Sequence, residues 1–300
     1  GGGAAIAAIR LHKGLLRAGI DSRMLFLHNH LQGKEYAAYA GTAPTLSRRV
    51  FRKLGGYTAV EDKNRLKISG KPQDYEIISF PVTSYQVEQH PWLQEADIIH
   101  LHWISGFVNY PAFFKNSNKP FVWTLHDMNP FQGIFHYAED RSLNEKHLGN
   151  IEQEMADIKY DALSKLKGDL TIVTPSAWLG ALASASRILS SFDHKVIPYG
   201  LDTTVFKPAY KVFARRVFDL PEDKVLFLFV SERISNRRKG FDLLLQAMDK
   251  LNGYDMAVCT AGMHGGTLLE NVYDMGPVND ERLMALLYAA ADAFVLPSRE

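Results

Sequence analysis

Short apolar segments, each about the length of one strand, recur along this chain with helical patterns between them. The apolar segments lie at 24–28, 96–103, 120–127, 169–176, 194–200, 224–232, 254–262 and 291–298, and helical patterns separate them, as at 177–192 and 240–251. Apolar strands that do not alternate strictly and that are joined by helices are typical of parallel sheets covered on both faces. The sequence therefore predicts an α/β protein built from doubly wound parallel sheets.

Length and linker composition indicate two such domains. The 300 residues exceed the usual size of a single hydrophobic core. The segment VIPYGLDTTVFKP at 196–208 holds two prolines and a glycine and follows a predicted strand without an immediate helix. We therefore expect an N-terminal Rossmann-like domain over 1–198 and a second Rossmann-like domain over 199–300.

Both ends of the chain look cut. The opening GGGAAIAAIRLHKGLLRAG predicts a glycine loop and then a helix that ends near Gly19, as in a β-α-β unit without its first strand. The glycines either let a phosphate approach the helix N-terminus or are simply a helix start or a cloning remnant. At the other end no helix follows the strand before Glu300. We expect the first strand to be missing and the second domain to be incomplete.

Composition and charge exclude several classes of protein. The chain has 46% apolar and 22% charged residues, which is typical of a globular protein. A net charge of +1 gives no global field for nucleic acid. The single cysteine, Cys259, excludes a disulfide framework and fits a reducing compartment. We expect a cytoplasmic protein that does not bind nucleic acid.

A basic segment at 48–71 is the one stretch with a marked local charge. It carries eight lysines and arginines against two acids, with apolar residues between them. It is either a solvated basic face or a surface that contacts a membrane or an anionic acceptor. Both interpretations stay open.

Polar residues directly after apolar strands are the candidates for a binding site, because ligands of open parallel sheets sit beyond the C-terminal strand ends. Arg233 follows one strand, and Lys239 comes just before Gly240 opens a helix. Two cations near a helix N-terminus suit a leaving diphosphate, although a solvated basic loop is the alternative. Glu300 follows another strand, where a carboxylate could bind sugar hydroxyls.

A second set of candidates lies in the first domain. His126 and Asp127 follow one strand, and His126 could donate a hydrogen bond to a substrate hydroxyl or serve a structural role. His100 and His102 are two apart on a strand and so share a face. Trp103, Asn109 and Tyr110 could line an acceptor pocket, with core packing as the expected role of the tryptophan. We expect no metal, since no Cys or carboxylate spacing accompanies His100, His102, His126 and His136.

Four segments together resemble the retaining glycosyltransferases of family 4, which have the two-Rossmann GT-B fold. YGLDTTVFKP is similar to the pattern N-G-I-D-x-x-x-F-x-P, with Tyr199 in place of Asn. SERISNRRKGFDLLLQAM resembles G-R-L-x-x-x-K-G-x-x-x-L-x-x-A, with one extra residue between Arg233 and Lys239. ERLMALLYAAADAFVLPSRE resembles L-x-x-L-Y-x-x-A-D-x-F-V-x-P-S-x-x-E, and VTPSAWL resembles P-S-x-W-L.

Two further segments, LHWISGFVNY and TLHDMNPFQGIFHY, resemble the branch that builds bacterial exopolysaccharides of the colanic-acid type. That branch often has T-G-G-C-H-Y followed by cysteines, where this chain has QGIFHY and none. The match to this branch is therefore partial.

The resemblance implies roles for particular residues. Arg233 and Lys239 would hold the diphosphate of a nucleotide sugar, with Gly2, Gly3 and Ser298 also at the donor. His126 would contact the donor sugar, and Glu300 would be at or next to the first carboxylate of the family's Glu-x7-Glu pair. His102, Trp103, Asn109 and Asp127 would face the substrate.

The resemblance also implies a reaction. We expect a retaining transferase that moves a sugar from a UDP- or GDP-sugar to a glycan or lipid-linked acceptor in bacterial surface polysaccharide synthesis, with no metal or other cofactor. The alternatives are a nucleotide-sugar epimerase of the same fold and a non-catalytic nucleotide- or glycan-binding protein. Because the second domain looks incomplete, we expect this stretch alone to be inactive and to bind a donor weakly or not at all.

Overall fold

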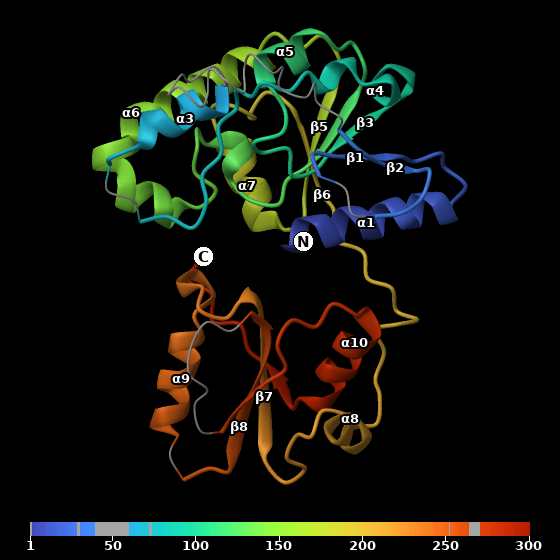
Figure 1. The fold of residues 1–300 in the computed structure, drawn as a ribbon, viewed down its shortest axis with the longest axis vertical. Coiled ribbons are helices and arrows are strands. Elements are labelled where there is room, and N and C mark those ends of the chain that lie inside the picture. The colour runs from blue at the N-terminus through green and yellow to red at the C-terminus, as the bar shows by residue number, and fades with distance from the viewer. Residues whose placement is uncertain (1, 29–30, 40–59, 72–73, 252, 264–270) are drawn as a thin grey trace, which may run out of the picture. The chain divides into compact units, whose positions relative to one another are not determined.

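A computed structural model describes residues 2–28, 31–39, 60–71, 74–251, 253–263 and 271–300. The chain divides into two compact units, with the division between Gly200 and Leu201 (Figure 1). This division lies in the linker segment where a domain boundary is predicted.

The first unit is built on a four-stranded sheet of order β3-β4-β5-β6, in which every neighbouring pair is parallel. Its strands are β3 (Ile99–Leu101), β4 (Phe121–Thr124), β5 (Leu170–Thr174) and β6 (Asp193–Val196). A separate parallel pair consists of β1 (Met24–Phe26) and β2 (Tyr36–Ala38). Strands β1, β3, β4 and β5 fall inside predicted apolar segments and β6 overlaps one, whereas β2 was not predicted. The predicted α/β class is confirmed for this unit.

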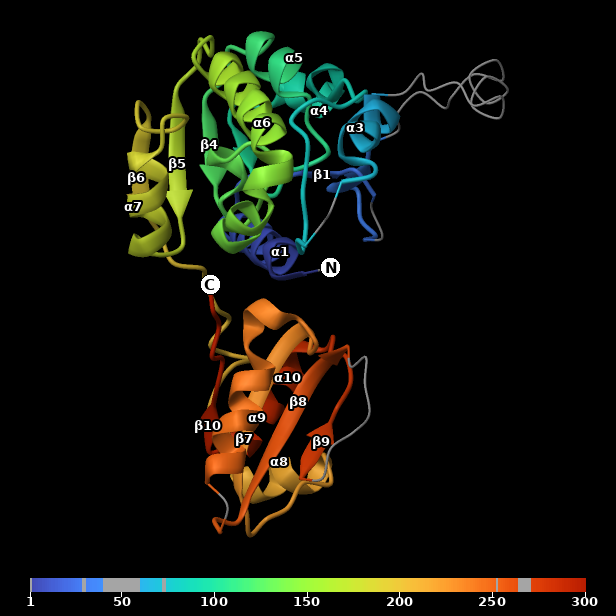
Figure 2. The same cartoon turned by 90° about the vertical axis from the view of Figure 1, so that its left-hand side faces the viewer.

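The first unit also contains six helices among the described residues. They are α1 (Gly2–Arg17), α3 (Val60–Ile68), α4 (Pro91–Glu95), α5 (Tyr110–Lys115), α6 (Ala138–Leu163) and α7 (Ala177–Ala185), with short 3-10 turns η1 (Val87–Gln89) and η2 (Asn129–Phe131). Helix α1 ends close to the predicted end at Gly19. Helices α5 and α6 pack on each other, as the two views agree (Figure 2).

Helix α7 begins as its sequence predicts and ends earlier. The Ser176 hydroxyl accepts a hydrogen bond from the Leu179 N–H at 3.3 Å, so Ser176 is the N-cap. The helix was predicted over 177–192, but it stops at Ala185 because Ser186 adopts an extended backbone. Ile188 and Leu189 beyond the helix are still buried in the core. Because Ile188 and Leu189 are apolar, the sequence pattern predicted a helix that continued past its observed end.

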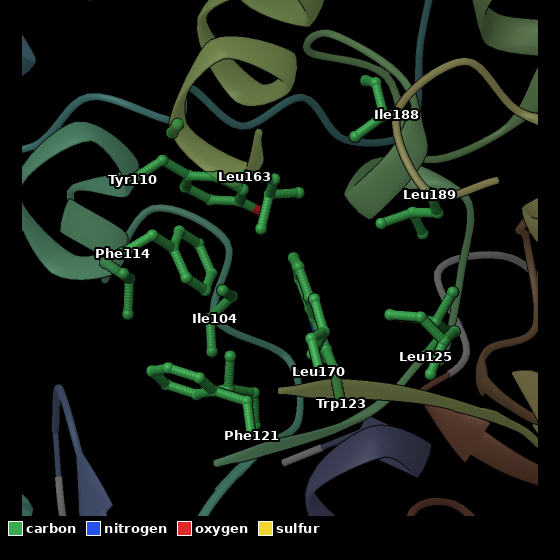
Figure 3. Close-up of a cluster of buried hydrophobic side chains, with 14 of the residues drawn as sticks. Ile104, Tyr110, Phe114, Phe121, Trp123, Leu125, Leu163, Leu170, Ile188 and Leu189 are labelled. Atoms are coloured by element: carbon green, nitrogen blue, oxygen red, sulfur yellow. The ribbon is translucent and has the colours of Figure 1, made fainter. Parts of the chain in front are cut away.

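The core of the first unit lies between the sheet and its helices. Phe121 and Trp123 of β4 are buried with Leu170 of β5, and they meet Tyr110 and Phe114 of α5 (Figure 3). Aromatic rings bury large apolar areas and prefer edge-to-face or tilted packing, as these do. This core fixes the strands whose ends carry the candidate site.

The second unit has a four-stranded parallel sheet of order β10-β7-β8-β9. Its elements are α8 (Lys211–Val217), β7 (Val225–Arg233), η3 (Arg237–Lys239), α9 (Phe241–Lys250), β8 (Met256–Met263), β9 (Val272–Asp274), α10 (Glu281–Ala290) and β10 (Ala293–Phe294). The predicted parallel sheet is confirmed here as well.

Alternate residues of β7 bury against opposite layers of the second unit. Leu226 and Leu228 belong to a core that includes residues of α8 and α10, whereas Phe229 packs with Leu244 of α9. Figure 1 shows α9 on one side of β7 and β8, with α8 and α10 on the other. This is the doubly wound arrangement predicted from the apolar strands.

Candidate functional site

Two strand ends in the first unit bring the predicted polar residues together. β3 ends at Leu101 and is followed by His102 and Trp103, and β4 ends at Thr124 shortly before His126 and Asp127. Because β3 and β4 are parallel neighbours, these residues leave the sheet at the same edge.

A chain of three side chains links this edge. The Nδ1 of His102 and the Nε2 of His126 lie 3.0 Å apart, and the Nδ1 of His126 lies 2.6 Å from the Tyr199 hydroxyl. The rings of His126 and Tyr199 stack with centroids 5.5 Å apart. Both nitrogens of His126 therefore have a hydrogen-bond partner within the protein.

Burial sets the charge state of these three side chains. It lowers the pKa of His126 to about 4, and burial with the neighbouring histidines lowers the pKa of His102 to about 3. Burial also raises the pKa of Tyr199 to about 12. At neutral pH all three groups are uncharged, and each hydrogen bond has one donor. A phenol is a better donor than a neutral imidazole, so the Tyr199 hydroxyl donates to the Nδ1 of His126.

Asp127 is the centre of a second set of contacts. Its Oδ2 accepts from the Nε1 of Trp103 at 2.9 Å and pairs with the Nδ1 of His136 at 2.7 Å, while its Oδ1 accepts from the Asn129 N–H at 3.0 Å. Burial opposes ionisation of Asp127, but the hydrogen bonds from His136 and Trp103 outweigh it and hold its pKa below the usual value. The carboxylate is thus charged and immobilised.

The structure corrects two expectations about the neighbouring aromatic residues. Trp103 was expected in the core, but it is 44% exposed, because its indole N–H is tied to Asp127 at the strand end. Tyr110 was considered for an acceptor pocket, but it is 2% exposed and packs in the core. Asn109 is half-buried, and its amide donates to the Thr83 carbonyl at 2.7 Å, so it holds a neighbouring loop.

His100 and His102 share a face, as predicted, and their rings stack at 4.5 Å. The Nε2 of His100 lies 2.8 Å from the Thr124 hydroxyl. His136 is fully buried and contacts Asp127 and the Ser79 hydroxyl. In the described part of the chain, no group of three or more His, Cys, Asp or Glu side chains is arranged to hold a metal ion.

Sequence reasoning missed three residues of this network. His136 was considered only as a metal ligand, and Glu152 and Lys159 were not considered, because they lie on a helix that was not predicted. Both are buried, and both contact the loop between Asn129 and His136. A charged residue at a buried helical position is the only signal that could have pointed to them.

The predicted cations of the second unit lie on one loop. Arg233 is the exposed last residue of β7, and Lys239 is the half-buried last residue of η3, with one residue between it and the start of α9. Gly240 joins η3 to α9 with a φ of 74°, and a Cβ there would lie 2.0 Å from the Pro297 carbonyl oxygen. A residue other than glycine would push this loop away from the segment after β10.

Arg299 fastens the end of the second unit to the same loop. Its guanidinium donates to the Arg237 carbonyl and to both oxygens of Asp242, at 3.0 and 2.6 Å. Its backbone N–H donates to the Arg238 carbonyl at 2.8 Å. Ser298 and Glu300 flank Arg299, so both lie on a segment that η3 holds.

A cavity of about 270 Å³ adjoins this loop. It is lined by Ile234, Ser235, Asn236, Arg237, Phe241, Asp242 and Leu245. Neither Arg233 nor Lys239 is among its lining residues. The structure therefore places the two predicted cations beside this hollow, on the loop from which the lining residues come.

The structure also places the remaining predicted residues. Gly2 and Gly3 form the first turn of α1, so the predicted loop that includes them is the start of the helix itself. Of the basic segment 48–71, residues 48–59 lie outside the described residues. The rest includes α3, whose Lys67 pairs with Glu154 at 2.6 Å. Among the described helices, none combines the length and apolar character needed to cross a bilayer.

Known sequences that are similar to this chain include those of glycosyltransferases. The D-inositol 3-phosphate glycosyltransferase of Streptosporangium roseum is 26% identical over 228 residues, covering 67% of this chain and 48% of that protein. The glycogen synthase of Rhodopseudomonas palustris is 29% identical over 248 residues, covering 68% of this chain and 50% of that protein. The chain thus spans about half the length of these curated relatives. No protein-family model matches it.

Comparison with solved structures gives the same fold. A glycosyltransferase from Rickettsia africae superposes with a TM-score of 0.53 at 15% identity, covering 98% of this chain and 69% of the other. WaaG, a glycosyltransferase involved in lipopolysaccharide biosynthesis, has a TM-score of 0.53 at 13% identity, covering 100% of this chain and 72% of the other. The chain is similar in fold to GT-B glycosyltransferases.

Proposed function

We propose that this chain is part of a retaining glycosyltransferase of family 4 that transfers a sugar from a UDP- or GDP-sugar. The observation that carries the proposal is the pair of strand-end polar sets. Neutral His126 lies with Asp127 and Trp103 in the first unit, and the Arg233–Lys239 loop lies before α9 in the second. The similarity to named glycosyltransferases over two thirds of the chain supports it.

In the first unit, we assign His126 to the donor sugar. Its pKa of about 4 keeps the imidazole neutral, so it exchanges hydrogen bonds with hydroxyl groups without carrying a charge. Trp103 presents an exposed indole whose orientation is fixed by Asp127. An aromatic face held in one orientation suits the apolar face of a sugar ring, because little freedom is lost on binding. His102 and Asn109 complete the proposed substrate-facing set.

In the second unit, Arg233 and Lys239 would stabilise the departing diphosphate, with Ser298 beside it and Glu300 binding a sugar hydroxyl. Fixed cations and the N–H groups at the start of α9 act where negative charge develops. The leaving phosphate oxygen takes the acceptor proton, so this route uses no side-chain base, metal or other cofactor. Gly2 and Gly3 are proposed to face the same diphosphate.

The acceptor class and cellular setting extend the proposal. We propose a glycan or lipid-linked acceptor in bacterial surface polysaccharide synthesis, on the cytoplasmic side of the inner membrane. The basic segment 48–71 would contact anionic headgroups. The interleaved apolar residues of that segment support such a contact.

A donor screen of the full-length protein tests the function. Each UDP- and GDP-sugar is incubated with candidate acceptors, and released nucleotide and product are measured together. The proposal expects nucleotide release that depends on an acceptor and a product whose anomeric configuration matches the donor. An epimerised donor without transfer would support the epimerase alternative, and binding without turnover would support a non-catalytic role. Either result would contradict the proposal.

A further inference from the structure

Two buried charged residues on α6 hold the backbone of the loop between Asp127 and His136. Glu152 is 4% exposed and Lys159 is fully buried. They lie on the face of α6 that also buries Leu148 and Met155. Neither residue touches the predicted ligand-facing side chains directly.

Glu152 fixes one half of this loop through its backbone donors. Its carboxylate accepts from the N–H groups of Gly133 and Ile134, both at 2.6 Å, and of Phe135 at 3.3 Å. A Cβ on Gly133 would lie 1.9 Å from the Glu152 carbonyl oxygen. Only glycine lets the loop approach α6 this closely.

Lys159 fixes the other half through backbone acceptors. Its Nζ donates to the carbonyls of Asn129 and Gln132 at 2.5 and 2.8 Å, and it lies 3.3 Å from the Asn129 Oδ1. It also lies 5.5 Å from the centre of the Tyr110 ring. One helix thus grips both the donors and the acceptors of one short loop.

Burying two ionisable side chains is an expensive way to hold a loop. Apolar residues of similar volume often stabilise a fold as well or better, because charged groups lose their hydration. Hydrogen bonds from such side chains give something that apolar contacts do not, which is a defined direction for each backbone group. The buried pair therefore indicates that the backbone of this loop must keep one defined geometry.

The loop passes this geometry to the strand-end site. The Asn129 N–H donates to Asp127, and the Asn129 amide donates to the carbonyls of Ile134 and Phe135. At the far end of the loop, His136 pairs with the Asp127 carboxylate that holds Trp103. Displacing the loop would move two of the three partners of Asp127, namely Asn129 and His136.

We propose that Glu152 and Lys159 are positioning residues, which set the path of residues 129–136 and thereby orient Asp127 and Trp103. What binds at Trp103 depends on the proposed function, but the orientation does not. The two can therefore be tested apart.

The test uses the full-length protein with Glu152→Gln and Lys159→Met. The indole N–H resonance of Trp103, assigned with Trp103→Phe, reports the hydrogen bond to Asp127 by NMR. We expect this resonance to shift or broaden in both variants, and kcat/KM for sugar transfer to fall at least tenfold. Leu179→Ala on α7, which packs on β5 and β6, is the control for general destabilisation. It should leave the Trp103 resonance in place.

Glu152→Gln keeps the side-chain volume and carries the test where Lys159→Met does not fold. An unchanged Trp103 resonance in folded Glu152→Gln would overturn the proposal, and so would an equal shift in Leu179→Ala. A shift confined to the Glu152 and Lys159 variants, in a protein whose wild type transfers no sugar, would support the positioning role and would count against the proposed function.

Discussion

At the scale of single residues, His126 has no nitrogen left for a ligand. Its Nε2 is bonded to His102 and its Nδ1 to Tyr199. In the proposed function, a sugar hydroxyl would therefore replace one of these partners. Tyr199 would be that partner, because it is 46% exposed and lies beyond the end of β6. Its phenol occupies the place that a substrate hydroxyl would take.

Tyr199→Phe should therefore strengthen donor binding. The variant keeps the ring stacked on His126 but frees the Nδ1, so the donor no longer competes with a phenol. One neutral hydrogen bond is worth about 1 kcal/mol, or roughly a fivefold lower Kd. Calorimetry on the full-length protein with its nucleotide sugar measures this. Weaker binding would instead mean that Tyr199 helps to orient His126.

The low pKa of His126 predicts how acid affects stability. The folded pKa is about 4, below the ordinary value of 6.5, so the unfolded chain binds more protons between these values. The contribution is fully present above pH 6.5 and is lost as pH falls toward 4. We expect urea unfolding to show that the free energy of unfolding falls less from pH 7 to pH 5 in His126→Gln than in the wild type. Equal losses would show that His126 is not the group that titrates.

At the scale of elements, the buried Lys159 of α6 makes the free energy of unfolding depend on pH in the alkaline range. Burial lowers the pKa of Lys159 from 10.5 to about 7, although Glu152 and Asp127 oppose the shift. The unfolded chain then binds more protons between pH 7 and 10.5, so stability from this group rises with pH. The unfolding free energy of the wild type relative to Lys159→Met should rise by up to about 1.4 kcal/mol per pH unit. Denaturation at pH 7.5 and pH 9.5 measures it, and a constant difference would contradict the assigned pKa.

Two glycines of the second unit have left-handed backbones but differ in how closely other atoms approach them. Substituting each one therefore distinguishes the cost of backbone strain from the cost of a steric clash. Gly240 has a φ of 74° and Pro297 against it, whereas Gly276 has a φ of 63° and nothing within 4 Å. Gly276→Ala should cost about 1–2 kcal/mol from strain alone. Gly240→Ala should cost about 2–5 kcal/mol, because the loop must also move.

Thermal unfolding of both glycine variants measures the difference, and donor affinity should fall only for Gly240→Ala. Equal losses of stability would mean that the loop yields easily to the extra methyl group.

The strands and the ends of several helices were predictable because their signals are local. Apolar runs marked the main strands, and Ser176 marked the start of α7. Helix α6 was not predicted, because Asn144, Glu152 and Lys159 occupy buried positions and break its apolar pattern. The contact of His126 with Tyr199 joins residues 73 apart in the chain, so no local pattern reveals it.

At the scale of the whole molecule, each unit places its candidate residues at or just beyond the C-terminal ends of parallel strands. In the first unit these are His126, Asp127 and Trp103, and in the second they are Arg233 and Lys239. This common placement was predictable from the fold class alone. Which side chains are exposed, as with Trp103, was not, because that depends on hydrogen bonds between strand ends.

In the proposed reaction Lys239 acts on the diphosphate of a nucleotide sugar, and substitution of this lysine is the sharpest test of that role. Lys250 lies on α9 as an exposed lysine at its other end and is the matched control. In the full-length protein, Lys239→Ala should lower kcat for sugar transfer about 100- to 1,000-fold, as loss of a group that stabilises developing charge does. Lys250→Ala should retain wild-type transfer. Unchanged transfer by Lys239→Ala would contradict the account.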